Sequence, residues 1–402
     1  MLLKVPQLKR LKIPHRFQRR IQSFLLILRQ RWPRVLFFLS AAWLFSIYAR
    51  RKHPFFHRAH EITSHDIEFE TVHPPRTNID TNAFLPLPTA RAFCSAHRWP
   101  IYEARKGRRK IFDLVMVNGE MDWLEIRMQE MGEHVDYFVV VESSVTFTGL
   151  ERELVVKKNW DRFQKWHKKI VYHVLENPPV GAKRTWDMED YQRNAMLVQA
   201  MRGLEGEKGP KDGDVVIVAD VDEVIRPAAL LVLRNCDVPK RVTLRSRFYY
   251  YGFQWLHIGE EWAHPQATTY QGLGDTILPA DLRNGEGGNK IAAWWNKADL
   301  WNAGWHCSSC FKTVEDMLDK MASFSHTGLN QEIFRDKVRI VDRVRKGKDL
   351  WDREGEVYER IEGNNDVPEF VKNERQRFGY LLNRDGPNGG FEDMGASEFT
   401  AD

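Results

Sequence analysis

Two aspartates, Asp220 and Asp222, end an apolar run in the segment DGDVVIVADVDEV, residues 212–224. Residues 215–219 predict a buried strand, and ligands of open α/β sheets bind beyond the carboxyl ends of such strands. Carboxylates at i and i+2 suit a hard cation, Mg²⁺ or Mn²⁺, and the phosphates that it holds. The alternative is an acidic turn before a helix that starts at Pro227, with an aspartate as its cap.

Polar residues also follow two earlier predicted strands, residues 111–117 and 137–141. Both loops are expected at the carboxyl edge of the same sheet, where a nucleotide would lie. A carboxylate or an amide there could hydrogen-bond a base or a ribose, although the same residues could simply form turns and solvate strand ends. The candidates are Asn118 and Glu120 after the first strand, and Glu142 and Thr146 after the second.

A charged segment precedes and enters a predicted helix over residues 186–202. Arg184 could neutralise a diphosphate, and Asp190 lies one or two turns further on. The alternative is a solvated helix face whose charges pair at i,i+3 spacing. A divalent ion rarely takes only an aspartate pair, so a later histidine is expected to join it. His326 and His306 are the candidates.

The elements that must position these groups follow an α/β pattern. Residues 111–117 and 137–141 are apolar strands, and residues 121–131 between them carry apolar side chains at helical spacing. Strand, helix and strand within about 30 residues predict a parallel βαβ unit. Further strands are predicted at 169–174, 215–219 and 241–251. We therefore expect a Rossmann-type mixed sheet in one catalytic domain, residues 111–385.

The N-terminal region predicts a membrane anchor. Residues 35–49 are uncharged and apolar, with basic clusters on both sides. Fifteen helical residues span about 22 Å, short of the roughly 30 Å hydrocarbon core, but flanking arginines can snorkel to close the gap. A cleaved signal peptide and a buried helix are the alternatives. We expect a basic cytosolic tail at 1–34, a signal anchor at 35–52, a stem at 53–110 and a disordered tail at 386–402.

The charge and the aromatic content restrict the function classes. The net charge is +5, but ten Lys or Arg residues precede residue 35, so the remainder is mildly acidic. The body of the chain therefore gives no support to nucleic-acid binding. The excess of basic residues before the anchor places the N-terminus in the cytosol and the rest in the secretory lumen. The 14 Trp residues suit sugar stacking, although they are also ordinary core material.

Four cysteines fit an oxidising compartment. Cys307 and Cys310 form a Cys-x-x-Cys pair for which a structural disulfide is the first interpretation. A thioredoxin-like motif would open a helix early in a βαβ unit, and zinc would need further ligands at close spacing. Whether Cys94 pairs with Cys236 stays open.

Several segments together resemble glycosyltransferase family 17. They are FDLVMVNGEMDWLEIRMQEM, YFVVVESSVTFTG, DVVIVADVDEVIRP, FYYYGF, AGWHCSSCF and VPEFVKNERQRFGYLLNRD, in that order, and they span about residues 111–385. The resemblance implies a two-lobed nucleotide-diphospho-sugar transferase (GT-A-like) fold on a single-pass type II anchor in the Golgi membrane. It also implies UDP-N-acetylglucosamine as the donor and a β-linked mannose of an N-glycan core as the acceptor. Asp220 and Asp222 match the family's acidic motif and would hold Mn²⁺ or Mg²⁺.

A β-1,4 product from an α-linked donor requires inversion at the anomeric carbon. Metal-assisted single displacement then needs a general base for the acceptor proton. By analogy with inverting enzymes of this fold, we rank Glu315 first, then Asp316 and Asp275. Two alternatives belong to other classes: a membrane-anchored, non-catalytic glycan-binding or scaffold protein of the same fold, and a luminal thiol oxidoreductase that uses Cys307 and Cys310.

Overall fold

The computed structural model describes residues 36–44, 60–72, 85–102, 109–175, 185–287, 296–323, 325 and 327–395. The chain divides into two units, Met1–His57 and Arg58–Asp402. In the first unit, residues 36–44 are helical. No helix among the described residues is long and apolar enough to cross a membrane. The rest of the expected anchor at 35–52, and the expected cytosolic tail, lie outside the described residues.

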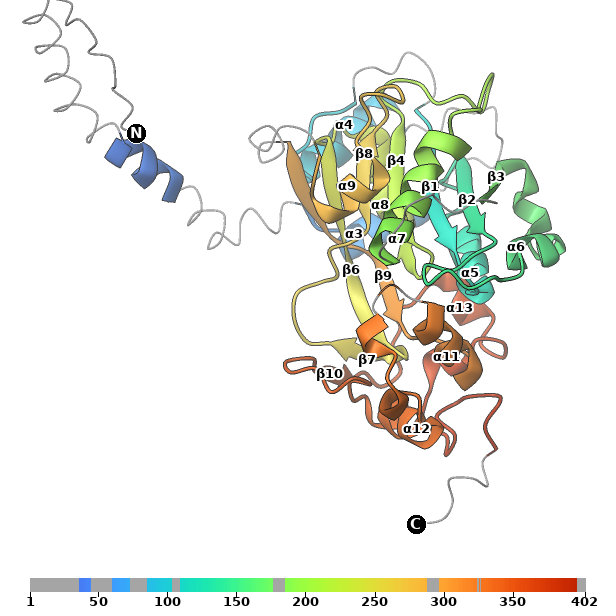
Figure 1. Cartoon of the computed structure of the whole chain (residues 1–402). Coiled ribbons are helices and arrows are strands. Elements are labelled where there is room, and N and C mark those ends of the chain that lie inside the picture. Colours follow the sequence, from blue (N-terminus) through green and yellow to red (C-terminus); the bar gives the residue numbers. More distant parts are fainter. Residues whose placement is uncertain are drawn as a thin grey trace, which may run out of the picture. The chain divides into compact units, whose positions relative to one another are not determined.

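The second unit is built on one mixed sheet (Figure 1). Its path runs β10-β7-β6-β8-β4-β1-β2-β3, and β9 pairs with both β5 and β6. β1 is parallel to β2 and β4, and β2 is parallel to β3, whereas β8 is antiparallel to β4 and β6. The strands are β1 Ile111–Val117, β2 Tyr137–Ser143, β3 Ile170–Leu175, β4 Val215–Asp220, β5 Glu223–Ile225, β6 Arg241–Tyr250, β7 Gly252–His257, β8 Gln266–Thr269, β9 Lys297–Ser308 and β10 Tyr358–Arg360.

Helices cover both faces of the sheet. They are α3 Ser64–Val72, α4 Leu87–Ala96, α5 Met121–Met131, α6 Val155–Lys158, α7 Thr185–Ala195, α8 Pro227–Asn235, α9 Pro279–Asn284, α11 Val314–Ser323, α12 Lys337–Lys346, α13 Glu369–Asn373 and α14 Gly379–Leu382. The 3₁₀ helices are η2 Trp160–Lys169, η4 Thr327–Leu329 and η5 Glu332–Phe334, and the π-helix is η3 Met196–Ala200. η3 is a π-helical continuation of α7, so the helix predicted at 186–202 changes its winding near its end.

The alternation of side chains along β1 explains the two layers. Val115 and Val117 belong to the cluster that includes α5 and α8, whereas Phe112 and Leu114 belong to the cluster that includes η3. Successive side chains of a strand point to opposite faces, so a strand buried on both faces is largely apolar; the buried Asp113 of β1 is paired with Arg127. The predicted βαβ unit of β1, α5 and β2 is confirmed, including its parallel pairing.

The folded unit begins earlier than the sequence predicted. The stem was expected to reach residue 110, yet Ile62 and Phe93 are buried in the first core cluster. Cys94 of α4 forms a disulfide with Cys236, just after α8, which settles the pairing left open above. The short helices α3 and α4 carry little periodic signal by themselves, because they are stabilised by packing on α8.

The disorder predicted at 386–402 is wrong for residues 386–395. Phe391 is fully buried, and Asp393 accepts the backbone N–H groups of Val314 and Glu315 at 2.8 and 3.0 Å. Glycine-rich composition predicted disorder, but Gly389 and Gly390 have φ of 66° and 71° and turn the chain onto the core. Residues 396–402 lie outside the described part.

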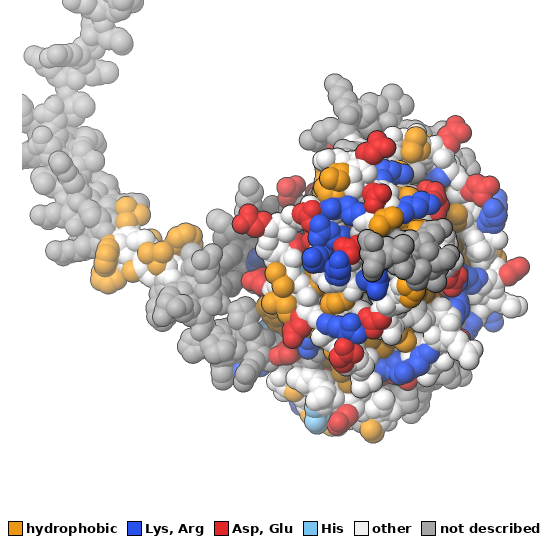
Figure 2. Space-filling view, turned by 90° about the horizontal axis from the view of Figure 1, so that it is seen from below, with side chains coloured by type: hydrophobic (Ala, Val, Ile, Leu, Met, Phe, Trp, Pro, Cys, Tyr) orange, Lys and Arg blue, Asp and Glu red, His pale blue; other side chains and the backbone are white. Residues whose placement is uncertain are grey.

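The basic helix α12 does not create a bare cationic surface. Figure 2 shows basic and acidic side chains interleaved on the face seen from below. Arg339 and Arg343 pair with Asp352, and Lys346 pairs with Asp342. This face therefore lacks the single-sign field that steers nucleic acid to a protein.

Candidate active site

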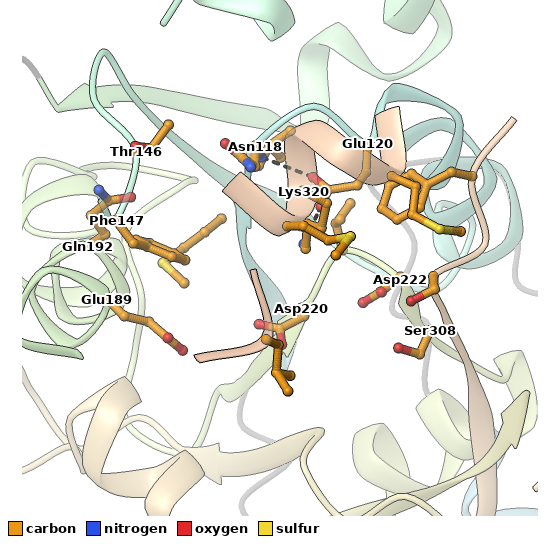
Figure 3. Close-up of a pocket in the computed structure, with 18 of the residues that line it drawn as sticks. Asn118, Glu120, Thr146, Phe147, Glu189, Gln192, Asp220, Asp222, Ser308 and Lys320 are labelled. Atoms are coloured by element: carbon orange, nitrogen blue, oxygen red, sulfur yellow. Dashed lines mark hydrogen bonds and ion pairs between the residues drawn. The ribbon is translucent and has the colours of Figure 1, made fainter. Parts of the chain in front are cut away.

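A cleft lies at the carboxyl ends of β1, β2 and β4, where the sequence predicted a site. It is walled by the loops after β1 and β2, by α7, by the end of β9 and by α11 (Figure 3). Asp220 ends β4, and Asp222 lies in the turn between β4 and β5. Both aspartates line the cleft, but their surroundings differ.

Asp220 is bound to two arginines that come from different helices. Its Oδ1 accepts Nη1 of Arg193 on α7 at 3.0 Å, and its Oδ2 pairs with Arg283 on α9. Burial raises the pKa of Asp220, but the charges of Arg283 and Arg193 outweigh burial and hold it well below its usual range. Asp220 therefore joins α7 and α9 to the end of the central strand.

Glu223 completes this network although it does not line the cleft. It is fully buried and accepts Nη1 of Arg283 at 2.9 Å and the indole N–H of Trp262 at 2.6 Å. It also accepts the backbone N–H of Asp220 at 2.7 Å. Glu223 thus fixes the turn that carries Asp222.

Asp222 faces the opposite side of the cleft, toward His306 on β9. The two side chains approach to 3.8 Å between Oδ1 and Nδ1. Burial raises the pKa of Asp222 to about 8 and lowers the pKa of His306 to about 4, so the imidazole is neutral and the contact is not an ion pair.

His306 is held in place by two aromatic rings that also contact each other. Its ring stacks on Phe248 and Trp262 at centroid distances of 5.0 and 4.5 Å. Among the described residues, its Nδ1 has no hydrogen-bond partner. A fixed neutral imidazole with an unused ring nitrogen beside a carboxylate fits a divalent cation. Within the described ranges, no group of three or more acidic, His or Cys side chains is arranged to hold a metal.

A second charged pair crosses the cleft. Lys320 of α11 pairs with Oε1 of Glu120, in the loop after β1. The other oxygen of Glu120 accepts the backbone N–H groups of Asn118 and Gly119 at 3.2 and 2.9 Å. Burial raises the pKa of Glu120, but Lys320 and these hydrogen bonds lower it to about 2 overall.

The other residues that were predicted to contact a nucleotide lie in different surroundings. Asn118 and Thr146 line the cleft. Glu142 is fully buried outside the lining, where it accepts the hydroxyl of Tyr172 at 2.6 Å and the backbone N–H of Val156 at 3.1 Å. Asp190 is not among the lining residues. Arg184 and the expected metal ligand His326 lie outside the described residues.

The three predicted bases are not brought together. Asp316, on the first turn of α11, lines an adjoining part of the cleft. Glu315 is exposed on the same turn and pairs with Lys337 at 3.5 Å. Asp275 is exposed in the loop between β8 and α9 and lines neither part of the cleft.

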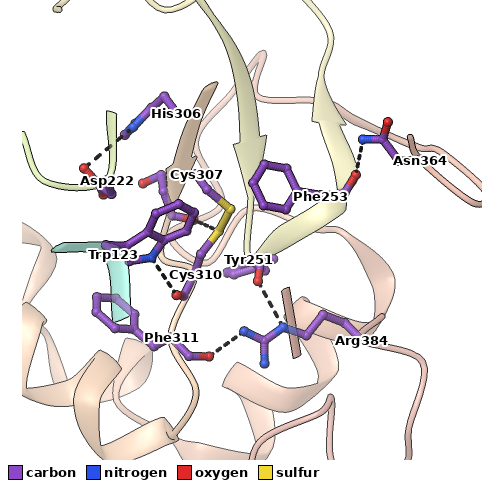
Figure 4. The surroundings of a disulfide bond; sticks show 11 residues. Trp123, Asp222, Tyr251, Phe253, His306, Cys307, Cys310, Phe311, Asn364 and Arg384 are labelled. Atoms are coloured by element: carbon purple, nitrogen blue, oxygen red, sulfur yellow. Dashed lines mark hydrogen bonds and ion pairs between the residues drawn. A yellow bond between two sulfur atoms is a disulfide. The ribbon is translucent and has the colours of Figure 1, made fainter. Parts of the chain in front are cut away.

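The predicted disulfide between Cys307 and Cys310 is confirmed, and it lies beside the cleft (Figure 4). Both sulfurs are buried, and the indole N–H of Trp123 donates to the carbonyl of Cys310 at 3.1 Å. The loop that it closes presents Ser308 and Ser309 to the cleft. This position indicates a structural role for the disulfide.

The comparisons with known proteins identify the family. The model of glycosyltransferase family 17 matches residues 69–385. The chain belongs to glycosyltransferase family 17. The match begins within α3, which supports the early start of the folded unit.

Similar family members carry the name β-1,4-mannosyl-glycoprotein 4-β-N-acetylglucosaminyltransferase. The Homo sapiens protein is 28% identical over 303 residues, which cover 69% of this chain and 56% of the relative. The Rattus norvegicus protein is 28% identical over 237 residues, covering 54% and 43%. The chain spans about half the length of the curated relatives it matches.

A solved structure of a mannosyltransferase from Pyrobaculum calidifontis, in complex with GDP-Man and Mn²⁺, is also similar. It has a TM-score of 0.30 and 12% identity, and covers 64% of this chain and 69% of its own. A likeness of this size adds nothing to the fold described above.

Charged and aromatic residues that had not been predicted include Arg193, Lys320 and Trp262, which line the cleft, and Arg283, which pairs with Asp220. Arg283 lies 63 residues from Asp220 in the sequence, and Lys320 lies 200 residues from Glu120. No local spacing relates members of such pairs. Arg193 alone carried a signal, since it stands in the charged helix that had been considered for diphosphate binding.

Proposed function

We propose that this family member transfers N-acetylglucosamine from UDP-N-acetylglucosamine to a β-linked mannose of an N-glycan core, forming a β-1,4 linkage with inversion. The names of its relatives and its family membership support this reaction. The observation that carries the proposal is the pairing of Asp222 with a ring-stacked, neutral His306 at the carboxyl edge of β4. The mixed sheet then corresponds to the nucleotide-diphospho-sugar transferase (GT-A-like) fold.

Asp222 and His306 would hold Mn²⁺ or Mg²⁺. A bound divalent ion would neutralise the charge that develops on the departing diphosphate. The loops that carry Asn118 and Thr146 would contact the nucleoside, because they stand at the carboxyl ends of β1 and β2. Asp220 acts indirectly, by fixing α7 and α9 around the donor.

Asp316 is the base that the structure favours among the three that we ranked. It is the one whose carboxylate lines the cleft, whereas Glu315 and Asp275 point elsewhere. In a single displacement it would take the proton of the attacking mannose hydroxyl as that oxygen bonds to the anomeric carbon and the diphosphate leaves with the bonding electron pair.

We also propose that residues 35–52 form the single-pass anchor of a type II Golgi membrane protein. The two disulfides support an oxidising, luminal location for the second unit. Protease treatment of sealed microsomes would test this topology. Protection of the C-terminal domain is expected, and digestion without detergent would contradict it.

The reaction is tested with the full-length protein in detergent, UDP-N-acetylglucosamine and an N-glycan acceptor. Transfer is expected with Mn²⁺, and it should disappear with a chelator and in Asp222→Asn. Asp342→Asn, an exposed residue paired with Lys346, is the matched control and should retain activity. If folded wild-type protein binds the glycan but neither binds nor consumes UDP-N-acetylglucosamine, it is a glycan-binding or scaffold protein instead.

A further inference from the structure

The cleft consists of two chambers that share a wall. The first chamber contains Asp220, Asp222 and His306, and the second opens between α5, α11 and the loop at 150–153. Their cavity volumes are about 190 and 550 Å³. Residues that line both chambers are Asn118, Glu120, Thr146, Arg152, Phe311 and Lys320. A ligand bound in one chamber and a ligand bound in the other must therefore react beside these residues.

The pair of Lys320 and Glu120 stands in this shared wall (Figure 3). Glu120 is fixed, because its side chain is 4% exposed and its second oxygen accepts two backbone N–H groups. Lys320 is less constrained: its side chain is 34% exposed and ends in an ammonium on a flexible four-carbon stem. If the pair separates, the lysine is the partner that moves.

The arginines that line the cleft already bind other groups of the protein. Arg193 bridges Asp220 and Glu189, and Arg152 donates to the backbone carbonyls of Val117, Asn118 and Ser143 at 2.7–2.8 Å. Turning either guanidinium toward a ligand would leave several buried acceptors without donors. Lys320 can turn at a smaller cost, since Glu120 keeps its backbone hydrogen bonds.

The field around Lys320 is strongly acidic. Burial lowers its pKa, but the charges of Glu120 and Asp222 outweigh burial and hold the pKa above its usual range, so the ammonium stays charged. Lys320 therefore already lies within the field of the first chamber. A diphosphate in that chamber would offer several charged oxygens, against the one oxygen that Glu120 presents.

We propose that Lys320 exchanges Glu120 for the diphosphate of the donor, and that this exchange frees Glu120 to accept a hydroxyl of the acceptor sugar in the second chamber. This inference rests on the proposed function. The second chamber suits a sugar, because Phe311 and Tyr380 offer ring faces and Asp316 and Asp319 offer acceptors. Donor binding would thus prepare the acceptor site.

The exchange predicts opposite effects of the two partners on donor affinity. Lys320→Met removes the cation that binds the diphosphate, so UDP should bind about tenfold to a hundredfold more weakly, as expected for a charge-assisted hydrogen bond. Glu120→Gln removes the competitor for Lys320, so UDP should bind as tightly as in wild type or more tightly. Sugar transfer should fall in both variants.

The measurement is a calorimetric titration of full-length protein with UDP, with Mn²⁺ and with chelator. Lys320→Arg should restore most of the affinity. Lys337→Met removes a lysine of similar exposure that pairs with Glu315 outside the first chamber, and it should bind UDP as wild type does. Thermal unfolding of every variant identifies those that fail to fold.

Three results would overturn the inference. A Lys320→Met variant that is folded and binds UDP like wild type removes the role of the lysine. Equal weakening in Lys320→Met and Glu120→Gln shows a purely structural ion pair. Absence of UDP binding in folded wild type refutes the proposed function itself, and the inference with it.

Discussion

The two aspartates of the Asp-x-Asp segment should respond in different ways to the same substitution. Asp220→Asn removes a charge that Arg193 and Arg283 share, and these side chains are 4% and 9% exposed. Asp222→Asn changes a carboxyl whose pKa is raised to about 8 by burial and by the nearby carboxylates of Asp220 and Glu223, so at neutral pH it removes little charge. The first change unpairs buried cations, whereas the second leaves the charge of the folded site almost unchanged.

The cost of Asp220→Asn follows from the partners that remain. Removing one member of a buried ion pair costs about 3–5 kcal/mol. Here the cost is smaller, because the Asp220 side chain is 39% exposed, Arg283 keeps Glu223 at 2.8 Å and Arg193 keeps Glu189 at 2.7 Å. We therefore expect a loss of about 2 kcal/mol, which lowers Tm by roughly 3 °C in a folded unit of this size. Asp222→Asn should leave Tm unchanged or raise it.

Thermal unfolding in the presence of a chelator measures stability without metal, and titration with UDP and Mn²⁺ measures the affinity of the site for UDP. The Asp222→Asn variant should lose metal-dependent UDP binding and keep the stability of wild type. The main effect of Asp220→Asn should be a loss of stability. Asp342→Asn, whose side chain is 46% exposed, should change the free energy of unfolding by less than about 0.5 kcal/mol. The reasoning is refuted if Asp222→Asn destabilises the protein as much as Asp220→Asn.

Two further predictions concern other carboxylates. Burial, together with the nearby charges of Glu369 and Glu70, raises the pKa of Glu130 to about 7 although backbone hydrogen bonds oppose the shift. The folded state thus prefers the protonated acid, so stability is lost as pH rises from about 4.5 to 7, by at most about 3 kcal/mol. Glu130→Gln should flatten this part of the curve of stability against pH, and an unchanged curve would contradict the pKa. Asp316→Asn should lower kcat at least about a hundredfold while Glu315→Gln stays near wild type, and steady-state kinetics that show the reverse would restore our first-ranked base.

The central strands could be predicted because each is buried on both faces. Residues 215–219 are a continuous apolar run, residues 111–117 are apolar except for Asp113, and a helix of clear periodicity follows the latter. The antiparallel strands of the sheet have a less regular sequence pattern. β9 has charged and polar residues at its start, and its pairing with β6 shifts register between Leu244 and Ser246. Such strands are specified by their neighbours, which the sequence does not place.

The same distinction separates the predicted and the missed site residues. Asp220 and Asp222 stand directly after a recognisable strand, so their place at the sheet edge followed from local pattern. Lys320 reaches the cleft from α11 and Arg283 reaches Asp220 from α9, and both helices are placed by contacts between distant segments. A lysine on an amphipathic helix is most often on a solvated face, so its type alone could not select it.

The geometry also changes what the Asp-x-Asp spacing means. The spacing suggested two carboxylates that grip one cation together. Asp220 is the last residue of β4 and is held between α7 and α9, whereas Asp222 lies in the following turn and faces β9. One carboxylate therefore joins the walls of the cleft, while the other is the one that we propose as a metal ligand. On this proposal the two-residue spacing places two different tasks on either side of one strand end.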